Sequence, residues 1–371
     1  MVRHFESLDL PIDKTKIPEG IFYLPKNLLI FDHFEQTLTL IAYNEEDLAK
    51  LINEYKSTVS SSKLPDFSAN AEFDGAMHSQ TNLAAEAQPH AQLAAVACRQ
   101  AETNILADHS FEDLVLKAKE NIVAGEVFQI VLSREFTQKT TLKPLEIYRR
   151  LRKTSPTPYM YFLKFPEFSI VGSSPETLVK IDQNEVIIHP IAGTRRRGKD
   201  DQEDQKLEEE LKNDIKEKAE HMMLVDLGRN DLGKIAIPGT IKINNLMSIQ
   251  KFDQVMHMVS EITGTRDPKK SIFDVFQATF PAGTLTGAPK VRAMEIIAKL
   301  EKVPREIYGG AVGYFGFNGN MDFAIAIRTM LYKDGQIYLR AGAGIVYDSL
   351  PKNENSECQN KAKGPLKSLI I

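Results

Sequence analysis

Residues 217–233 restrict the possible fold of this chain more than any other segment, because they combine a strongly apolar stretch with several ionisable side chains. Residues 222–227 are apolar around most of a helical turn, which predicts a helix buried on nearly all sides. Ionised groups are costly in such a place unless they are paired or bound to a metal. Glu217 and Glu220 are three residues apart, so their carboxylates lie on one face, within reach of one hard cation. The segment therefore indicates either a cation site or an internal salt-bridge network with Arg229.

The composition excludes several classes of function. The chain has 371 residues, of which 42% are hydrophobic and 26% charged, as in ordinary globular proteins. A formal net charge of −4 provides no attraction to nucleic acid or to an anionic membrane. No apolar run reaches the ~18 residues that a membrane-spanning helix needs. The two cysteines, Cys98 and Cys358, form neither a disulfide framework nor a zinc-binding spacing. The N-terminus resembles neither a secretion signal nor a transit peptide. We expect a cytoplasmic protein that binds neither nucleic acid nor membrane.

The chain divides into three parts by composition and pattern. Residues 1–56 predict a hairpin, with strands over 28–32 and 38–42, followed by a helix over 45–55 that Asn44 caps. Residues 57–109 are rich in Ser, Ala, Gln and His with weak periodicity, which predicts a connector that is poorly ordered or partly helical. Residues 110–371 carry regular patterns again and form the main domain.

The main domain mixes helices and strands without strict alternation. Helices are expected over 111–123 after a cap at Ser110, over 144–153, 272–279 and 290–300, and from about 355 onward, with a charged, solvated segment over 201–213. Strands are expected over 127–136, 235–243, 252–263, 309–317, 323–332 and 336–347, with a meander over 159–165, 169–172, 177–181 and 186–191. This order favours an α+β fold of stacked, mostly antiparallel sheets flanked by helices, rather than a doubly wound sheet.

Several polar groups interrupt the apolar strands, and each one alone is a weak signal. Glu176 follows a strand and a proline, where an acid is more often a turn residue. His257 lies in an apolar run, where a lone histidine is usually a satisfied core residue. The glycine-rich loop over 281–289 offers backbone N–H groups to an anion, but it does not have the pattern of a P-loop.

Arg328 and a second acid pair are more informative. A guanidinium at the end of an apolar strand needs an anion, from the protein or from a ligand. The glycines of residues 341–345 let a ligand approach the backbone. Glu354 and Glu357 repeat the spacing of the first acid pair, so both pairs could meet at one divalent ion. The alternative for Glu357 is an intrahelical bond to Lys361. The residues alone favour a pocket for a small carboxylate-bearing substrate held partly through a metal ion.

The motifs at these positions resemble, in the same order, those of the chorismate-utilising enzymes. They are Pro-Ile-Ala-Gly-Thr-Arg (190–195), the segment from Glu-His-Met-Met to Asn-Asp-Leu-Gly (220–233), Val-Met-His-Met-Val-Ser (255–260), Pro-Ala-Gly-Thr-Leu-Thr-Gly-Ala-Pro-Lys (281–290), Tyr-Gly-Gly-Ala-Val-Gly-Tyr (308–314), Ala-Ile-Arg-Thr (326–329) and Ala-Gly-Ala-Gly-Ile-Val (341–346). The resemblance covers about 111–363 densely and 2–55 loosely. Within the family, the chain is most similar to the synthase subunits of anthranilate synthases.

The resemblance implies a substrate, a cofactor and a partner. Chorismate and ammonia would be converted to anthranilate and pyruvate for tryptophan biosynthesis, with Mg²⁺ as cofactor. The ammonia would come from a glutamine amidotransferase subunit, component II. Residues 110–371 would be the chorismate-binding catalytic domain, and residues 1–56 a remnant of the family's N-terminal region.

The resemblance also assigns roles to residues of this sequence. Glu220 and Glu357 match the metal ligands, with Glu217 and Glu354 beside them. Glu176 matches the acid that protonates the departing ring hydroxyl, His257 matches the histidine associated with pyruvate elimination, and a carboxylate such as Glu217 is the alternative base. The positions that match the substrate pocket are Gly193, Thr194, Thr284, Tyr308, Arg328, Gly342, Ala343 and Gly344.

Ala192 separates this chain from its siblings. Similar enzymes that make aminodeoxychorismate, isochorismate or salicylate commonly have a lysine here, whereas a methyl group leaves space for free ammonia. Two alternatives stay open: the synthase subunit of aminodeoxychorismate synthase, and a non-catalytic assembly subunit.

The family's synthase subunits usually begin earlier, so we expect a shortened chain with an open sheet edge and without the Leu-Leu-Glu-Ser motif of tryptophan inhibition. Pro365 is expected to interrupt the terminal helix.

Overall fold

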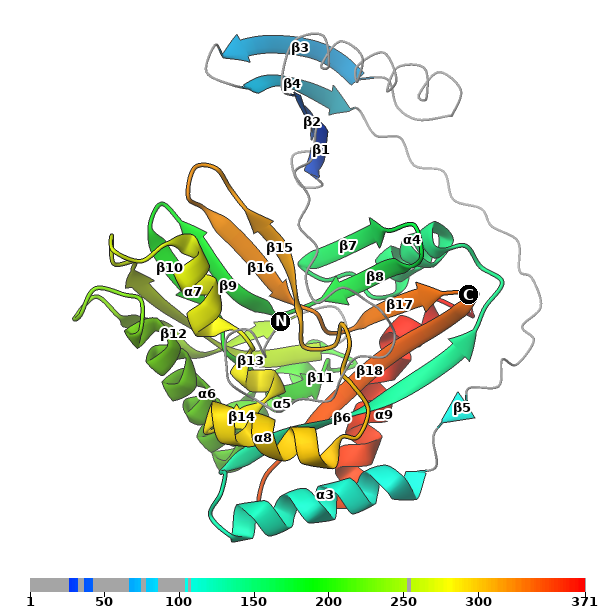
Figure 1. Cartoon of the computed structure of the whole chain (residues 1–371), viewed down its shortest axis with the longest axis vertical. Coiled ribbons are helices and arrows are strands. Elements are labelled where there is room, and N and C mark those ends of the chain that lie inside the picture. The colour runs from blue at the N-terminus through cyan, green and yellow to red at the C-terminus, as the bar shows by residue number, and fades with distance from the viewer. Residues whose placement is uncertain are drawn as a thin grey trace. The chain divides into compact units, whose positions relative to one another are not determined.

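The structure is a computed structural model that describes residues 27–32, 37–42, 67–74, 78–85, 104–105, 108–251 and 255–370. The chain forms two compact units (Figure 1), one over Pro18–Ala97 and one over Cys98–Ile371 together with Met1–Ile17. The helix predicted over 45–55 and its cap at Asn44 lie outside the described residues.

In its described part, the smaller unit is a four-stranded antiparallel sheet with the order β1-β2-β4-β3. Its strands are β1 (Asn27–Asp32), β2 (Thr37–Ala42), β3 (Phe67–Asp74) and β4 (His78–Ala85). The predicted hairpin is confirmed as β1 and β2. Strands β3 and β4 lie inside the segment predicted to be a connector that is poorly ordered or partly helical. Their Ser, Ala and Asn residues have low strand propensity, and backbone pairing takes its place, since β3 pairs with β4 and β4 pairs with β2.

The larger unit contains two antiparallel sheets, each of seven strands among the described residues. The first has the order β14-β6-β18-β17-β8-β7, with β5 paired to β6. Its strands are β5 (Asn104–Ile105), β6 (Gln129–Lys139), β7 (Tyr159–Lys164), β8 (Ser169–Ser174), β14 (Gly287–Ala288), β17 (Thr329–Lys333) and β18 (Gln336–Ile345). The buried strands β6 and β18 pair along nearly their whole lengths and form its centre.

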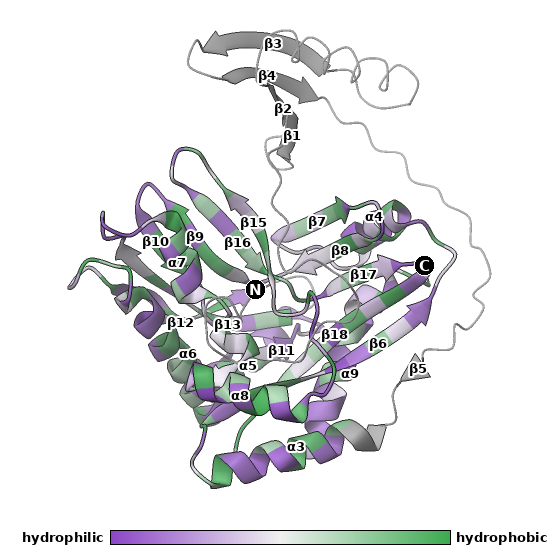
Figure 2. Ribbon diagram, viewed as in Figure 1, coloured by the Kyte–Doolittle hydropathy of each residue, from purple (hydrophilic) through white to green (hydrophobic). Residues whose placement is uncertain are grey.

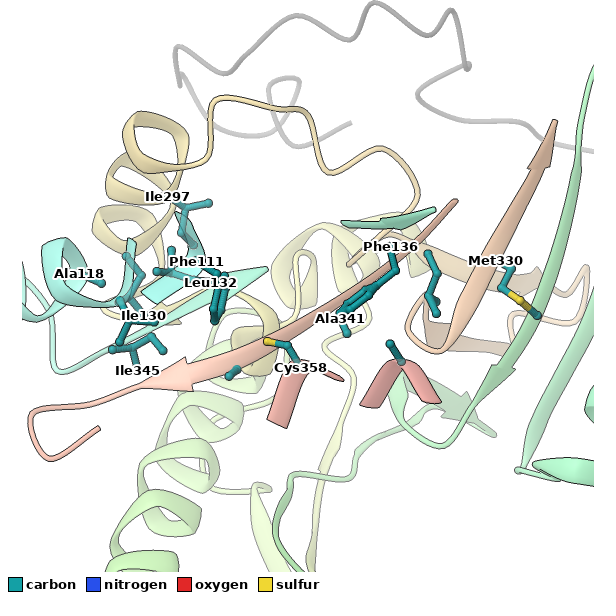
Figure 3. Close-up of a cluster of buried hydrophobic side chains, with 14 of the residues drawn as sticks. Phe111, Ala118, Ile130, Leu132, Phe136, Ile297, Met330, Ala341, Ile345 and Cys358 are labelled. Carbon is teal, nitrogen blue, oxygen red and sulfur yellow. The ribbon is translucent and has the colours of Figure 1, made fainter. Parts of the chain in front are cut away.

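Four helices pack on the first sheet: α3 (Asp108–Val123), α4 (Pro144–Thr154), α8 (Lys290–Leu300) and α9 (Pro351–Lys367). One buried cluster joins them to the strands (Figure 3), with Phe111 from α3, Ile297 from α8 and Cys358 from α9 around Ile130 and Leu132 of β6. Hydrophilic and hydrophobic residues alternate along α3 (Figure 2), as expected for a helix with one face in this core.

The second sheet has the order β11-β13-β10-β9-β16-β15, with β12 paired to β13, in the described part of the chain. Its strands are β9 (Thr177–Asp182), β10 (Glu185–Ile188), β11 (Ile191–Arg196), β12 (Lys242–Lys251), β13 (Val255–Thr265), β15 (Ala311–Phe315) and β16 (Met321–Ile325). Helices α6 (Ile215–Gly233) and α7 (Ile272–Thr279) pack on it through Val225, Leu232, Val275 and Phe276. Helix α5 (Asp201–Asn213) places Leu211 against Met256 and Met258 of β13.

The expected α+β class is confirmed, since every strand pair among the described residues is antiparallel. The predicted meander is wrong, because β7 and β8 form a hairpin in the first sheet while β9 and β10 form one in the second. The strand predicted over 323–332 is also divided, into β16 of the second sheet and β17 of the first. Local patterns indicate that a segment is extended, but they do not specify which sheet it joins.

Some element boundaries differ from the prediction. Helix α3 begins at Asp108, so Ser110 lies inside it and is not its cap, and the strand expected over 235–243 begins later, as β12 at Lys242. Helix α9 continues through Pro365 to Lys367, so the expected interruption does not occur. In the part of the chain that the structure describes, no helix has the length and apolar character needed to cross a bilayer.

Helix α6 is buried on one face only. His221, Leu224 and Val225 are buried, whereas Asp226 and Arg229 are exposed and pair with each other at 3.0 Å. The predicted burial on nearly all sides and the predicted network with Arg229 are therefore wrong. The ionisable residues in the middle of the segment avoid the core by facing solvent, which is the less costly solution for a charge.

Candidate active site

The chain crosses between the two sheets at two adjacent points, and each crossing carries a predicted site residue. Glu176 lies between β8 and β9, and Arg328 lies between β16 and β17. The backbone N–H of Ile325 donates to the Glu176 carbonyl oxygen at 3.0 Å, and that of Ser173 donates to the Arg328 carbonyl oxygen at 3.3 Å. Arg328 has a φ of +51°, a left-handed conformation that ends the extended strand. The two side chains are thus anchored at one junction of the sheets.

Glu176 has the properties of a proton donor. The Thr284 hydroxyl, from the short helix η1 (Gly283–Leu285), donates to its Oε1 at 2.7 Å. Burial raises the pKa of Glu176 to about 7, against the lowering effects of Thr284, Lys361 and Arg328. A carboxyl group with such a pKa is partly protonated near neutral pH and can act as a general acid.

Arg328 supplies a positive charge in the interior of the same site. Burial lowers its pKa, while Tyr308, Glu176 and Glu357 act in the opposite direction. These neighbours come from three different segments, so the guanidinium faces the site and not the bulk solvent. Such a group can hold a carboxylate with two parallel hydrogen bonds.

Strand β18 forms a wall whose glycines allow close approach. A Cβ on Gly342 would lie 2.4 Å from the Tyr308 hydroxyl oxygen, and one on Gly344 would lie 2.6 Å from Nε2 of Gln129. Ala343, between them, is fully buried. Burial raises the pKa of Tyr308, which therefore remains a hydroxyl donor. The missing side chains let the Tyr308 hydroxyl and the Gln129 amide pack directly against the backbone of β18.

A bulge in β11 forms a third side of the site. Ala192 pairs with Met258 and Thr194 pairs with His257, while the register shifts at Gly193, whose φ is +67°. The Thr194 hydroxyl and Nδ1 of His257 are 3.0 Å apart. Burial lowers the pKa of His257, as do the nearby Arg328 and Lys361, while the Gly193 carbonyl raises it. The imidazole is therefore neutral near pH 7 and available as a base.

The four predicted acids lie on α6 and α9. Burial raises the pKa of Glu220, and the charges of Glu217 and Glu357 raise it further, so acids from the two helices do lie within electrostatic reach. Burial and Glu357 likewise raise the pKa of Glu354. Glu357 also forms the intrahelical bond considered above, since its Oε1 is 2.6 Å from Nζ of Lys361.

The acids suit Mg²⁺ better than a metal that needs many protein ligands. Among the described residues, no three His, Cys, Asp or Glu side chains are placed to hold a metal together. Mg²⁺ is usually bound by one or two carboxylates, with water and substrate oxygens completing its shell. The charges of Glu217 and Glu357 disfavour the ionised form of Glu220, and a bound cation would favour it. Glu220 and Glu357 are thus the residues that fit such an ion.

Lys361 is a site residue whose importance sequence reasoning missed. Its Nζ donates to the Gly342 carbonyl oxygen at 2.9 Å, and its charge lowers the pKa of both Glu176 and His257. The signal was its position four residues after Glu357, which was interpreted only as a helix-stabilising pair. Gln129 and Arg195, which contact Glu220 and Glu217, were also missed: Gln129 lies outside the matched motifs, and Arg195 ends the 190–195 motif without an assigned role.

Comparison with known proteins shows which enzyme family the chain belongs to. The sequence profile of the chorismate binding enzymes matches residues 1–367. Anthranilate synthase component 1 of Acetivibrio thermocellus is 43% identical over 373 residues, which cover 100% of this chain and 73% of the relative. The chain therefore belongs to the chorismate-binding enzyme family.

Within the family, the similarities converge on one branch. Anthranilate synthase component 1 of Aquifex aeolicus is 52% identical over 261 residues, covering 70% of this chain and 53% of the relative. The crystal structure of anthranilate synthase component I from Streptococcus pneumoniae TIGR4 matches with a TM-score of 0.78 at 36% identity, covering 96% of this chain and 76% of that one. The menaquinone-specific isochorismate synthase of Escherichia coli, at 19% identity and a TM-score of 0.70, shares the fold. Sequence and structure both support the anthranilate synthase component I branch.

Proposed function

We propose that this protein is the synthase component of an anthranilate synthase, which converts chorismate and ammonia to anthranilate, pyruvate and water. The observation that carries the proposal is the junction of the sheets, where a protonatable Glu176 adjoins Arg328, and Arg328 lies within electrostatic reach of Glu357 on α9. Ala192 disfavours aminodeoxychorismate synthase, the second candidate, because related enzymes commonly use a lysine there. The proposed setting is tryptophan biosynthesis in the cytoplasm.

Different residues bind the substrate, protonate the leaving group and remove the ring proton. Arg328, the Tyr308 hydroxyl and the backbone of 342–344 orient chorismate through its carboxylates. Ammonia forms a bond to the ring carbon beside the ring carboxylate while the double bonds shift and the ring hydroxyl departs. Glu176 gives its proton to that hydroxyl, so the leaving group is water. His257 or Glu217 then removes the ring proton next to the new amine, the ether bond breaks, and pyruvate leaves an aromatic product.

Glu220 and Glu357 would hold Mg²⁺, with Glu354 close by. When bound, the ion would neutralise the ring carboxylate and withdraw charge from the ring. Ammonia would be supplied by a glutamine amidotransferase subunit, component II. The purified chain should then use ammonium salts alone, and glutamine only after that subunit is added.

The test is the fluorescence of anthranilate formed from chorismate, Mg²⁺ and an ammonium salt by the purified protein. Steady formation of anthranilate and pyruvate in equal amounts supports the proposal. Accumulation of aminodeoxychorismate would assign the chain to the second candidate, and failure to consume chorismate would indicate a non-catalytic assembly subunit.

Removal of the metal should stop the reaction. We expect excess EDTA to eliminate anthranilate formation and added Mg²⁺ to restore it, because one or two carboxylates bind Mg²⁺ reversibly. Circular dichroism in EDTA serves as the folding control. Full activity in EDTA with an intact spectrum would contradict the proposed metal.

Replacement of Arg328 by glutamine should weaken substrate binding. Hydrogen bonds to charged groups contribute about 1.5–3 kcal/mol, so we expect KM for chorismate to rise about 10- to 100-fold. Steady-state kinetics at saturating ammonium measures the effect. An unchanged KM would show that Arg328 does not bind the substrate.

A further inference from the structure

The two glutamates of α6 are each contacted by a donor from a different sheet. Nε2 of Gln129, on β6 of the first sheet, donates to Oε1 of Glu220 at 3.0 Å. Nη1 of Arg195, on β11 of the second sheet, donates to Oε1 of Glu217 at 3.0 Å. Glu217 and Glu220 are three residues apart on one helix, and a separate donor orients each of their carboxylates.

Gln129 is held rigidly where it meets Glu220. Its residue is 4% exposed, and its Nε2 occupies the space next to Gly344, where an added Cβ would approach it to 2.6 Å. Its backbone carbonyl oxygen lies 2.2 Å from the position that a Cβ on Gly287 would take, so β14 fixes the strand from the other side. The same would-be Cβ on Gly344 lies 3.6 Å from Oε1 of Glu220. The amide therefore directs this carboxylate toward the glycine wall of the site.

Arg195 connects the bulged strand to the start of α6. Its Nη2 is 2.8 Å from Oδ2 of Asp214, and Asp214 caps the helix by accepting from the backbone N–H of Glu217. Its Nη1 also donates to the Thr194 carbonyl oxygen at 3.0 Å. A Cβ on Gly193 would lie 3.1 Å from Oε2 of Glu217. One oxygen of Glu217 is thus taken by the guanidinium, and the other faces the bulge.

The two donors differ in charge, and they therefore act differently on the two carboxylates. Arg195 places a positive charge, shared with Asp214 and Glu210, against Glu217, whereas the neutral amide of Gln129 orients Glu220 without adding a charge. The bond from Gln129 therefore fixes the direction of the Glu220 carboxylate without adding a countercharge to it. Groups that orient a metal's carboxylate ligand in this way typically change metal affinity 10- to 100-fold when they are replaced.

We propose that Gln129 and Arg195 are positioning residues with separate tasks: Gln129 orients Glu220 toward the cation, and Arg195 holds Glu217 against the bulge of β11 beside the substrate. The inference rests on the proposed function and extends it to two residues to which the resemblance assigned no role. It predicts that metal affinity and turnover can be impaired separately by replacing one donor or the other.

The test titrates Mg²⁺ by calorimetry into protein saturated with chorismate in the absence of ammonia, so that no turnover occurs. Gln129→Met keeps the side-chain volume but removes the donor, and its Mg²⁺ Kd should rise about 10- to 100-fold. Its kcat at saturating Mg²⁺ should stay within about threefold of the wild type, since only the positioning of the ion's ligand is lost. Arg195→Gln should show the reverse. Its Mg²⁺ Kd should stay within about threefold of the wild-type value, and its kcat should be about 100-fold lower than that of the wild type. Arg195→Lys should recover part of that kcat.

Two matched variants serve as controls. Gln138→Met makes the same change at another buried position of β6, and Arg196→Gln removes the exposed neighbour that pairs with Glu203. Both should retain wild-type Kd and kcat. An unchanged Mg²⁺ Kd in Gln129→Met, or equal losses of Kd and kcat in both test variants, would overturn the inference while wild-type anthranilate formation still supports the function. A wild type that neither binds Mg²⁺ nor forms anthranilate would overturn the proposed function itself.

Discussion

A Glu176→Gln variant should form anthranilate about 10²- to 10⁴-fold more slowly than the wild type, because a positioned general acid contributes that much to a rate. Glutamine preserves the shape of the side chain and can still accept the hydrogen bond from Thr284, but it has no proton to transfer at neutral pH. The departing hydroxyl would then leave as hydroxide. Stopped-flow or steady-state fluorescence at saturating chorismate measures the change in kcat.

The pH dependence gives an independent test of the same residue. The reaction needs the protonated form of Glu176, whose pKa burial raises to about 7 from an ordinary 4.5. At a constant concentration of neutral ammonia, the rate should therefore fall as pH rises above about 7. The Thr284 hydroxyl lowers that pKa, so Thr284→Val should move the fall to higher pH.

The control for this variant is Glu167→Gln, which changes an exposed glutamate in the turn between β7 and β8. It should leave both kcat and the pH profile unchanged. A Glu176→Gln variant that retains wild-type kcat, or one that retains the same fall above pH 7, would show that another group supplies the proton.

Replacement of Ala192 by lysine should abolish anthranilate formation. Ala192 pairs with Met258 next to the bulge at Gly193, in the strand whose Thr194 contacts His257. A lysine there introduces a primary amine and a long side chain where free ammonia has to approach. The new ammonium also adds positive charge to a site that already holds Arg328 and Lys361. Anthranilate fluorescence and separation of the products measure the outcome.

Ala192→Met distinguishes the amine from its bulk, because methionine has a similar length without a charge. We expect Ala192→Met to retain more activity than Ala192→Lys, and Ala192→Ser to retain most of it. Unchanged anthranilate output from Ala192→Lys would refute the assignment of this position to free ammonia.

Three helices were predicted to within one residue at each end. Helix α4 begins at a proline, α7 begins at Ile272 after Ser271, which caps it with a complete capping box, and α8 follows Pro289. These signals are local, and they act through hydrogen bonds and backbone angles within a few residues. The strands β3 and β4 were missed because they lack such signals and depend on pairing with each other and, for β4, with β2.

The candidate site was predictable in its chemical groups but not in its arrangement. The spacing of Glu217 and Glu220 correctly placed both acids on one helix, whereas the space in front of Gly342 and Gly344 is taken by Tyr308 and Gln129. Lys361 was misjudged because its bond to the Gly342 carbonyl is a contact between two elements. The same reason applies to Gln129 and Arg195.

The sequence by itself determined the main helices, the antiparallel class of the fold and the acids, arginine and histidine available for chemistry. Each of these follows from side-chain periodicity, capping or residue type over short stretches of chain. Only the tertiary structure decided which sheet each strand joins, and hence that Glu176 and Arg328 stand at adjacent crossings. Strands of similar composition can pair in either sheet, and the choice between them depends on how all elements bury their apolar faces together.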